Sequence, residues 1–345
     1  MNQSYMWANS SDSVDITTGT RINYWPQFGV LQYFEFAYIV SIIALGSLGN
    51  LVVIFSIILD KKVHSGGNIF IINLAIADFF ICSITLPCIA VTIIKTKRVV
   101  DDIFCEVVGF IVTATCACSL CNLALIAANR YWAIVKSSCY RQMFSKRLGL
   151  CLAMSAWIWS IAITMPTVLG WGDIAYDAKS LICGWHDAAS LSYAIFLIVI
   201  AVVLPLGTII FSYYNIFREV RSSLQDVRSL GKRSISSQSS RSRSLTKERN
   251  LVYTLMTTVV VFFVCWTPYA AHALVNPSNV KPHVKKVLVW LALSNSCVNF
   301  IIYGVMNQAF KKRYKKLFNF IFQCGKRDLS ASMQLGYASA KETNS

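Results

Sequence analysis

The chain has 345 residues, of which 55% are hydrophobic and only 14% are charged, and its mean hydropathy is +0.53. Soluble domains carry about 25% charged residues, so this composition excludes an ordinary soluble domain. A bilayer is the expected solvent for so much apolar surface. The net charge of +16 does not by itself indicate nucleic acid, and we expect no nucleic-acid partner, because the distribution of charge matters more than its sum.

The first 33 residues form a polar tail that contains no apolar stretch of the signal-peptide type. We therefore expect the first apolar run to act both as targeting signal and as membrane span. Asn2 and Asn9 each begin an Asn-X-Ser glycosylation pattern. Glycosylation there requires that residues 1–33 form an extracellular tail.

Seven apolar runs have the roughly 20 residues that a spanning helix needs. Their predicted limits are 34–59, 69–94, 103–135, 149–171, 189–217, 248–274 and 283–306. We therefore predict an all-α membrane protein, a seven-transmembrane helix bundle that occupies residues 34–306. Because the number of spans is odd, the two termini lie on opposite sides of the membrane.

The connections between the spans divide into two sets by charge. One set holds nine basic residues between Arg218 and Arg249 and a further basic cluster between Lys311 and Lys316. In the other set, lysines are interleaved with aspartates such as Asp101. The positive-inside rule places the first set in the cytoplasm, so we predict a multi-pass plasma-membrane protein with an extracellular N-terminus.

Three cytoplasmic segments follow from this orientation. Residues 222–247 are rich in Ser, Arg and Lys, which predicts a flexible third cytoplasmic loop near anionic lipid, with serine phosphorylation as a further hypothesis. Residues 307–322 alternate aromatic and basic side chains at helical spacing, which predicts a short amphipathic eighth helix on the inner leaflet. Cys324 follows this helix and begins the tail 323–345; it is predicted to be palmitoylated, the alternative being a free thiol.

Most of the 12 cysteines lie inside apolar runs and are expected to be small buried hydrophobes. Cys105 and Cys183 differ, since one begins the third span and the other lies in the longest outer loop. Both face an oxidising compartment, which predicts a disulfide between them. No Cys/His spacing indicates a transition metal.

Ionisable residues inside a membrane are costly and point to function. Asp78 lies in the middle of the second span. Polar residues of other spans lie at similar depth: Asn50, Ser119, Asn295, Ser296 and Asn299. Their oxygens could hold a sodium ion with the carboxylate, and the alternative is a hydrogen-bonded network without an ion. We expect no other cofactor.

Arg130 lies near the inner end of the third span, and Glu248 at the start of the sixth is its candidate partner. A breakable ion pair between two helices can act as a switch, although an ordinary juxtamembrane pair is the alternative. Pro268 lies next to Trp266 inside the sixth span. A proline kinks a helix, so the inner end of this helix could pivot.

Taken in chain order, these residues resemble those of rhodopsin-like (class A) G-protein-coupled receptors over about residues 30–324. The motifs that carry the resemblance are Gly49-Asn50, Leu74-Ala75-Ile76-Ala77-Asp78, Asn129-Arg130-Tyr131, Trp157, Pro205, Tyr213, Cys265-Trp266-Thr267-Pro268 and Asn299-Phe300-Ile301-Ile302-Tyr303. The ordered set is highly specific, although each motif alone is weak.

The resemblance implies a receptor that binds an extracellular small ligand and activates a heterotrimeric G protein by outward movement of the sixth helix, with arrestin and a receptor kinase as further partners. Trp266 would be the toggle beneath the ligand. The relay residues would be Leu120, Pro205 and Phe262. The residues that admit the G protein would be Asn129, Arg130, Tyr131, Tyr213, Glu248 and Tyr303. The Asp78 cluster resembles the sodium pocket of the family.

Two residues depart from the common pattern of the family, since Asn129 replaces the usual acid and Phe300 replaces the usual proline. Both departures point to melatonin receptors, which share the Asn-Arg-Tyr triplet and also lack that proline. This resemblance suggests an inhibitory G protein. The ligand-binding positions depart from it, since Thr167, Ala201 and Asp187 stand where melatonin receptors have Asn, His and Gln. We therefore expect the signalling machinery to match melatonin receptors better than the pocket does.

The expected ligand pocket is aromatic and mostly uncharged, which suits a small, flat, largely apolar ligand. Its candidate residues are Val112, Thr113, Trp185, His186, Trp266, Tyr269, Ala270 and His272. About half of the aromatic rings could instead serve core packing.

Other functions are less well supported. Val112 replaces the Asp of amine receptors, and Leu293 replaces the Lys that opsins need for their Schiff base. A peptide or another small molecule as ligand stays open within the same class. A transporter or channel would favour internal repeats and several midplane charges, neither of which the sequence has. The sequence does not support an enzymatic function, because no nucleophile–base set is present.

Overall fold

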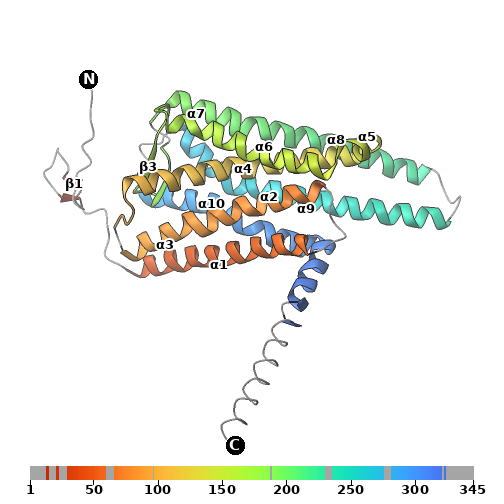
Figure 1. The fold of residues 1–345 in the computed structure, drawn as a ribbon, viewed down its shortest axis with the longest axis horizontal. Coiled ribbons are helices and arrows are strands. Elements are labelled where there is room, and N and C mark those ends of the chain that lie inside the picture. Colours follow the sequence, from red (N-terminus) through yellow and green to blue (C-terminus); the bar gives the residue numbers. More distant parts are fainter. Residues whose placement is uncertain are drawn as a thin grey trace, which may run out of the picture.

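The computed structural model describes residues 13–14, 21–22, 29–59, 66–95, 97–186, 189–229, 235–275, 281–320 and 322–323. Within these residues, seven helices are long and apolar enough to cross a membrane. They lie side by side as one bundle, which confirms the predicted fold class (Figure 1). Asn2, Asn9, Asp187 and Cys324 lie outside the described residues.

Most spans begin and end within a few residues of their predicted limits, and the exceptions are the end of the fifth and the start of the sixth. The first, third and seventh spans are single helices: α1 (Val30–Ile58), α4 (Asp102–Val135) and α10 (Pro282–Met306). The second and fourth are α2 (Gly66–Phe80) with η1 (Ile81–Thr85) and α3 (Leu86–Lys95), and α6 (Lys146–Thr164) with η2 (Met165–Thr167). The fifth and sixth are α7 (Leu191–Leu197) with η3 (Ile198–Val203) and α8 (Leu204–Ser229), and α9 (Ile235–Val275).

Two spans contain a wider π-helical turn that the hydrophobic pattern did not predict. In the second span η1 ends just before Pro87, and in the fifth η3 ends just before Pro205. A proline has no N–H for the carbonyl four residues earlier. A π turn accommodates this missing hydrogen bond without ending the helix, and such turns are frequent at functional sites.

The helix starts are fixed by side-chain caps. Asp101 accepts a hydrogen bond from the Phe104 backbone N–H at 2.7 Å, and Ser145 accepts one from Leu148 at 3.2 Å. Such caps satisfy backbone donors that have no partner within the helix. They place the start of α4 and of α6 within a few residues of the predicted limits.

The fifth and sixth spans continue as helices into the segment that was predicted to be a flexible loop. In the structure α8 extends to Ser229 and α9 begins at Ile235, so the two helices protrude together beyond the bundle (Figure 1). Residues 222–229 contain no Gly or Pro. A helix that is already formed adds such residues at little cost.

A short helix follows the seventh span over residues 308–320 and confirms the predicted eighth helix. Asn307 begins it by accepting the Ala309 backbone N–H at 3.0 Å. The helix leaves the bundle near the end of α1 at a steep angle to the bundle axis (Figure 1). Its apolar face is anchored by Phe310 and Leu317, which are buried.

The strands are few and short. Ser13–Val14 (β1) pairs with Arg21–Ile22 (β2), and Ile174–Asp177 (β3) pairs antiparallel with Ile182–Trp185 (β4). The β3–β4 hairpin lies between α6 and α7 in sequence and packs on α4 at one end of the bundle (Figure 1). The sequence predicted only a long outer loop here, without strands.

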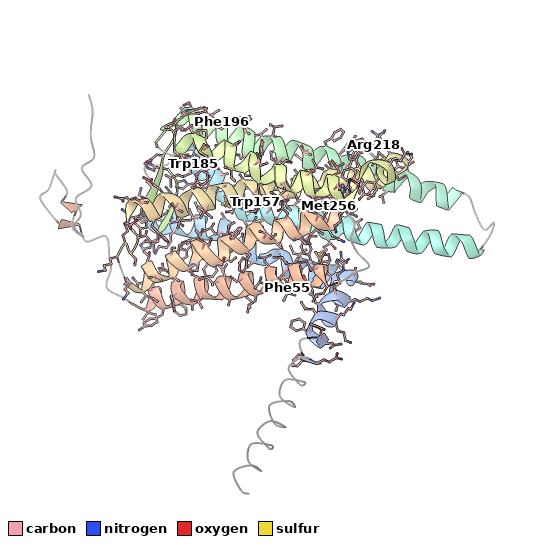
Figure 2. All side chains as sticks on the ribbon, viewed as in Figure 1. Phe55, Trp157, Trp185, Phe196, Arg218 and Met256 are labelled. Carbon is pink, nitrogen blue, oxygen red and sulfur yellow. A yellow bond between two sulfur atoms is a disulfide. The ribbon has the colours of Figure 1, made fainter. Side chains whose placement is uncertain are left out.

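The helix α4 is central, with α2, α6 and α8 packed against it. A buried polar chain joins three of these helices: Trp157 Nε1 donates to Asn73 Oδ1 at 2.8 Å, and Asn73 Nδ2 donates to Asn122 Oδ1 at 2.9 Å. Trp157 lies near the middle of the bundle (Figure 2). Because a buried amide is stable only when hydrogen-bonded, this chain fixes how the three helices meet.

Candidate functional site

Asp78 is fully buried and gathers polar groups from several spans. Asn299 Nδ2 of α10 donates to Asp78 Oδ2 at 2.6 Å, and Ser119 Oγ of α4 donates to Oδ1 at 3.4 Å. Beside them, Asn50 Nδ2 of α1 donates to the backbone oxygen of Ser296 at 2.9 Å. The structure therefore brings together residues of the first, second, third and seventh spans around one carboxylate.

Two amide oxygens near this cluster are buried without a donor. Asn295 Oδ1 and Asn50 Oδ1 have no hydrogen-bond partner in the part of the chain that the structure describes. An unsatisfied buried acceptor costs about 1–3 kcal/mol, so it is normally matched by a donor, a water or a cation. A carboxylate with hydroxyl and amide oxygens is the ligand set that hard cations prefer. The residues present thus fit a small hard cation chemically.

Arg130 lies near the opposite end of α4 from the disulfide. Its Nη2 donates to Asn129 Oδ1 at 3.1 Å, and Asn129 Nδ2 donates to the Tyr140 hydroxyl of α5 (Ser137–Met143) at 3.2 Å. A Cβ at Gly67 would overlap Arg130 Nη2 and crowd Asn129 Oδ1, so the start of α2 closes over this pair. The side chain of Glu248 lies outside the described residues, and its pairing with Arg130 stays a prediction.

Four of the predicted switch and relay residues lie in one buried cluster. Tyr213 and Tyr303 share it with Leu120 and Phe262, and Tyr213 is within electrostatic reach of Arg130. Tyr303 stacks on Phe310 with their ring centroids 5.1 Å apart. Pro205 is also buried, next to the π turn of the fifth span, and Tyr131 packs on Phe211 at 5.5 Å.

An aromatic column runs along α9 above this cluster. The ring of Trp266 stacks on Phe262 at 5.8 Å between centroids and meets Tyr269 edge-on at 6.2 Å. Pro268 lies inside the helix between Trp266 and Tyr269, and the kink at this proline stays a prediction. The column connects the predicted ligand region to the cluster that contains Tyr213 and Tyr303.

The predicted ligand residues are divided between two groups of contacts. Val112 and Tyr269 pack in a cluster that also contains Trp290 and Leu293 of α10. Trp185 instead packs toward the third, fourth and fifth spans and meets Tyr193 at 6.4 Å between centroids. This separation leaves the two sides of the predicted pocket lined by different helices.

The polar members of the predicted pocket differ in their hydrogen bonding. Thr113 Oγ1 donates to the Gly109 backbone oxygen at 2.8 Å, and His186 Nδ1 lies 3.7 Å from Asp173 Oδ2 in the exposed loop. By contrast, Trp185 Nε1 and both ring nitrogens of His272 are buried and have no partner among the described residues. These two side chains therefore offer unused hydrogen-bonding groups.

Sequence reasoning missed the contact between the β3–β4 hairpin and α10. Lys285 Nζ lies 3.2 Å from Asp177 Oδ2, and Trp290 Nε1 donates to the Ser180 backbone oxygen at 3.0 Å. Between these anchors, Leu181 adopts φ 61° and packs against the cluster of Val112 and Trp290. The signal available in the sequence was Lys285, a lysine in the outer part of an apolar span.

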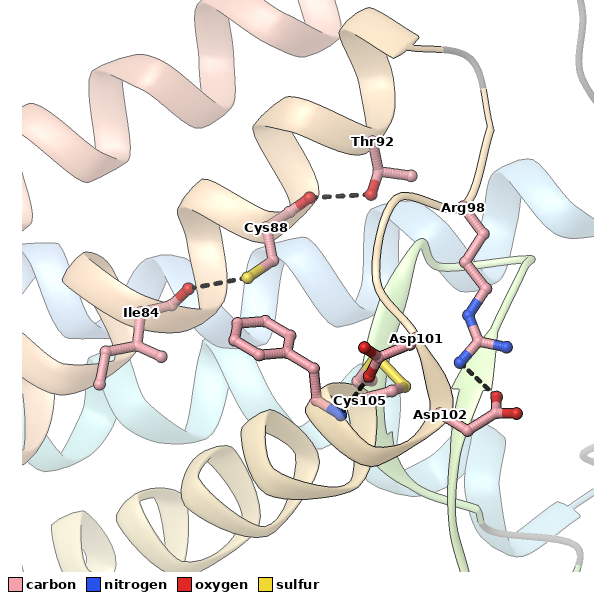
Figure 3. Close-up of a disulfide and its surroundings, with 9 residues drawn as sticks. Ile84, Cys88, Thr92, Arg98, Asp101, Asp102 and Cys105 are labelled. Atoms are coloured by element: carbon pink, nitrogen blue, oxygen red, sulfur yellow. Dashed lines mark hydrogen bonds and ion pairs between the residues drawn. A yellow bond between two sulfur atoms is a disulfide. The ribbon is translucent and has the colours of Figure 1, made fainter.

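The predicted disulfide between Cys105 and Cys183 is present and joins the start of α4 to β4 (Figure 3). Beside it, Arg98 pairs with Asp102 at 2.6 Å and lies over the ring of Tyr176 at 5.4 Å. Burial raises the pKa of the Tyr176 hydroxyl, so this ring stays neutral beneath the guanidinium. The disulfide and the cation–π contact hold the hairpin against the bundle.

Comparisons with known proteins agree with this architecture. The family described as 7 transmembrane receptor (rhodopsin family) matches residues 49–303. Melatonin receptor type 1C of Xenopus laevis is 31% identical over 277 residues, which cover 78% of this chain and 64% of that protein. The type 1C receptor of Gallus gallus is 31% identical over 81% of this chain and 80% of its own length.

A further relative and one solved structure are also similar to this chain. Melatonin receptor type 1A of Mus musculus is 31% identical over 78% of this chain and 76% of its own length. Among solved structures, squid rhodopsin superposes with a TM-score of 0.79 over 92% of this chain and 93% of its own, at 23% identity. At that identity the superposition shows the fold alone.

Seven spanning helices around a buried carboxylate, with a disulfide-tied hairpin at one end of the bundle, define a seven-helix membrane receptor fold. The chain belongs to the rhodopsin family of 7 transmembrane receptors, the class A G-protein-coupled receptors, and within it resembles the melatonin receptors. It is accordingly a multi-pass membrane protein.

Proposed function

We propose that this receptor binds a small extracellular ligand and activates a heterotrimeric G protein, of the inhibitory type, by outward movement of α9. The observation that carries the proposal is the continuous buried contact from Trp266 through Phe262 to the cluster of Tyr213 and Tyr303. A ring displaced at Trp266 would disturb the packing near Arg130, since the parts of a packed core do not deform independently. Arrestin and a receptor kinase are proposed as further partners.

The proposed orientation follows the charge of the connections. The basic residues of α8, α9 and the helix 308–320 gather at the end of the bundle that holds Arg130, and we place this end in the cytoplasm. The hairpin and its disulfide then face the extracellular space, where disulfides persist. Ligand would bind toward the hairpin, and the G protein would bind at the Arg130 end.

A sodium ion is proposed at Asp78 as an allosteric partner. Ser119, Asn295 and Asn299 would hold it together with the carboxylate, and the buried oxygen of Asn295 without a donor supports this assignment. The ion would neutralise the buried charge and tie α2, α4 and α10 together. Separation of these helices on activation would weaken its binding.

The pocket favours a small, flat, largely apolar ligand that differs from melatonin in its polar contacts. Trp185 Nε1 is a hydrogen-bond donor without a partner among the described residues. The two ring nitrogens of His272 also have no partner there. At the positions where melatonin receptors bear Asn and His, Thr167 donates to its own helix at Thr164, 2.8 Å away, and Ala201 offers no polar group. Melatonin would lose those contacts here.

A panel of G-protein biosensors in cells tests the function, with melatonin and related indoles as ligands. Arg130→Ala is the coupling control, and Trp266→Ala tests the toggle, with surface expression measured for each variant. We expect an inhibitory G-protein response to an indole with Arg130 present and none in either variant. A full response in Arg130→Ala would contradict the proposed coupling, and a normal agonist response in Trp266→Ala would contradict the toggle role.

A further inference from the structure

An open hollow of about 140 Å³ lies between the end of α1 and the helix 308–320. It is lined by Ser56, Leu59, Arg313, Lys316, Leu317 and Phe320. None of these residues belongs to the ligand region, to the Asp78 cluster or to the Arg130 pair. We call this hollow the α1 groove. Its role is therefore separate from ligand binding, the Asp78 cluster and the Arg130 pair.

The walls of the α1 groove are apolar. Leu317 is buried at its floor, whereas Leu59 and Phe320 are 46% and 54% exposed on either side. Ser56 contributes little polarity, because its hydroxyl donates to the backbone oxygen of Val53 at 2.9 Å. Exposed leucine and phenylalanine on a membrane protein are suited to contact with acyl chains.

The rim of the α1 groove is cationic. Arg313 and Lys316 line it one helical turn apart, and residues 307–322 contain five basic and no acidic residues. The guanidinium of Arg313 is held in place, since its side chain is largely buried and lies 4.8 Å over the ring of Phe310. A fixed guanidinium beside a flexible ammonium is a favourable arrangement for phosphate oxygens.

The position of the α1 groove also fits a lipid. The helix 308–320 runs at a steep angle to the bundle axis (Figure 1), which is the direction expected of an amphipathic helix on the membrane surface. The groove thus spans the boundary between headgroups and acyl chains, where basic residues meet anionic lipid. Its rim is also close to the switch region, because Phe310 contacts both Arg313 and Tyr303.

We propose that the α1 groove binds one anionic phospholipid of the inner leaflet. The headgroup phosphate lies against Arg313 and Lys316, and an acyl chain lies along Leu59 and Phe320. A free phosphate would leave these apolar walls uncovered, so the lipid is the occupant that matches both halves of the groove. The side of the membrane rests on the proposed function, whereas the binding chemistry does not.

Native mass spectrometry of the full-length receptor in neutral detergent tests the proposal directly. The probes are phosphatidylserine, phosphatidylinositol bisphosphate and, as the uncharged comparison, phosphatidylcholine. We expect both anionic lipids to form a one-to-one complex at lower concentration than phosphatidylcholine does. Equal binding of phosphatidylcholine would overturn the proposal.

Lys316→Gln and Lys315→Gln form the matched pair of variants. Both lysines are exposed on the same helix and both changes remove one charge, but only Lys316 lines the groove. We expect Lys316→Gln to weaken anionic lipid binding about fivefold and Lys315→Gln to leave it unchanged. An equal loss in both variants would mean general adsorption of the basic helix and would overturn a specific site.

Leu59→Ser tests the acyl-chain wall, with Leu45→Ser as a control on an exposed position elsewhere on α1. We expect weaker lipid binding only for Leu59→Ser.

Displacement of the lipid by an equal concentration of soluble inositol phosphate would show that phosphate alone suffices, and would overturn the lipid assignment. None of these measurements involves a G protein, so failure here is distinguishable from failure of the proposed function.

Discussion

At the scale of single residues, Asp78 is the side chain that most needs compensating interactions, because burying a charge in a membrane bundle costs free energy. Its hydrogen bonds from Ser119 and Asn299 offset part of that cost. If a sodium ion supplies the rest, NaCl should raise the thermal unfolding temperature of the purified receptor more than KCl at equal ionic strength. Asp78→Asn should abolish this difference, and Ser119→Ala should reduce it. An equal effect of the two salts on the wild type would exclude the ion.

Asn129 is the second residue with a testable consequence, because it stands where most of the family has an acid. Its amide accepts from Arg130 at 3.1 Å and donates to Tyr140 at 3.2 Å. Asn129→Asp would replace a bond between an ion and a neutral group by an ion pair, which holds Arg130 more firmly.

We expect Asn129→Asp to lower basal G-protein activation several-fold, since about 1.4 kcal/mol changes an equilibrium tenfold. Biosensor signal without ligand, normalised to surface expression, measures this. Tyr140→Phe is the control that removes only the second hydrogen bond of Asn129 and should change basal activity less. Raised basal activity in Asn129→Asp would contradict the locking role.

The residues of the polar centre could be predicted because intramembrane polar side chains are rare, so few partners are available for Asp78. The contact of Asp177 with Lys285 could not, since it joins a loop to a helix more than a hundred residues later. Its formation depends on the path of the hairpin and on the left-handed conformation of Leu181. No local sequence pattern predicts the path of the hairpin or the conformation of Leu181.

At the scale of elements, α1 and α10 meet through a glycine. A Cβ at Gly49 would overlap the ring of Phe300, the residue that replaces the proline common in the family. Gly49→Ala should therefore force the two helices apart at a cost of about 1–3 kcal/mol and lower the thermal unfolding temperature.

Gly207→Ala on α8 is the matched control for this change, because an added Cβ there meets nothing within 4 Å. We expect Gly207→Ala to leave the unfolding temperature unchanged or to raise it. The double variant Gly49→Ala with Phe300→Ala should recover part of the loss, since the smaller side chain makes room. Equal stability of Gly49→Ala and wild type would show that the contact can relax freely.

The spans were predictable as elements because a long apolar run has few other structures available in a membrane. Their internal detail was not. The π turns before Pro87 and Pro205 leave the hydrophobic pattern unchanged, and the four-residue strands β3 and β4 are too short to show a period. The Ser- and Arg-rich composition of residues 222–229 favoured a flexible loop, whereas continuation of α8 determined the backbone structure.

At the scale of the whole molecule, one end of the bundle is closed by contacts between distant parts of the chain. The hairpin is tied to α4 by the disulfide and to α10 by Lys285, while Lys286 of α10 pairs with Glu35 of α1 at 2.7 Å. Both ion pairs are largely buried, so salt should screen them weakly. The other end, which carries Arg130, lacks such a covalent tie among the described residues and is the end proposed to open.

The disulfide should accordingly control the stability of the closed end. Cys105 and Cys183 are 78 residues apart, and closing a loop of that length stabilises a chain by up to about 4.5 kcal/mol when the unfolded state is a free coil. An unfolded membrane protein keeps much of its helix, so the measured loss should be smaller. We expect Cys183→Ser to lower the thermal unfolding temperature and to increase amide hydrogen exchange in β3 and β4, whereas Cys139→Ser, at an exposed free cysteine, should change neither. Unchanged exchange in the hairpin of Cys183→Ser would show that Asp177, Lys285 and Trp290 suffice to hold it, and that the covalent tie is dispensable for closing this end.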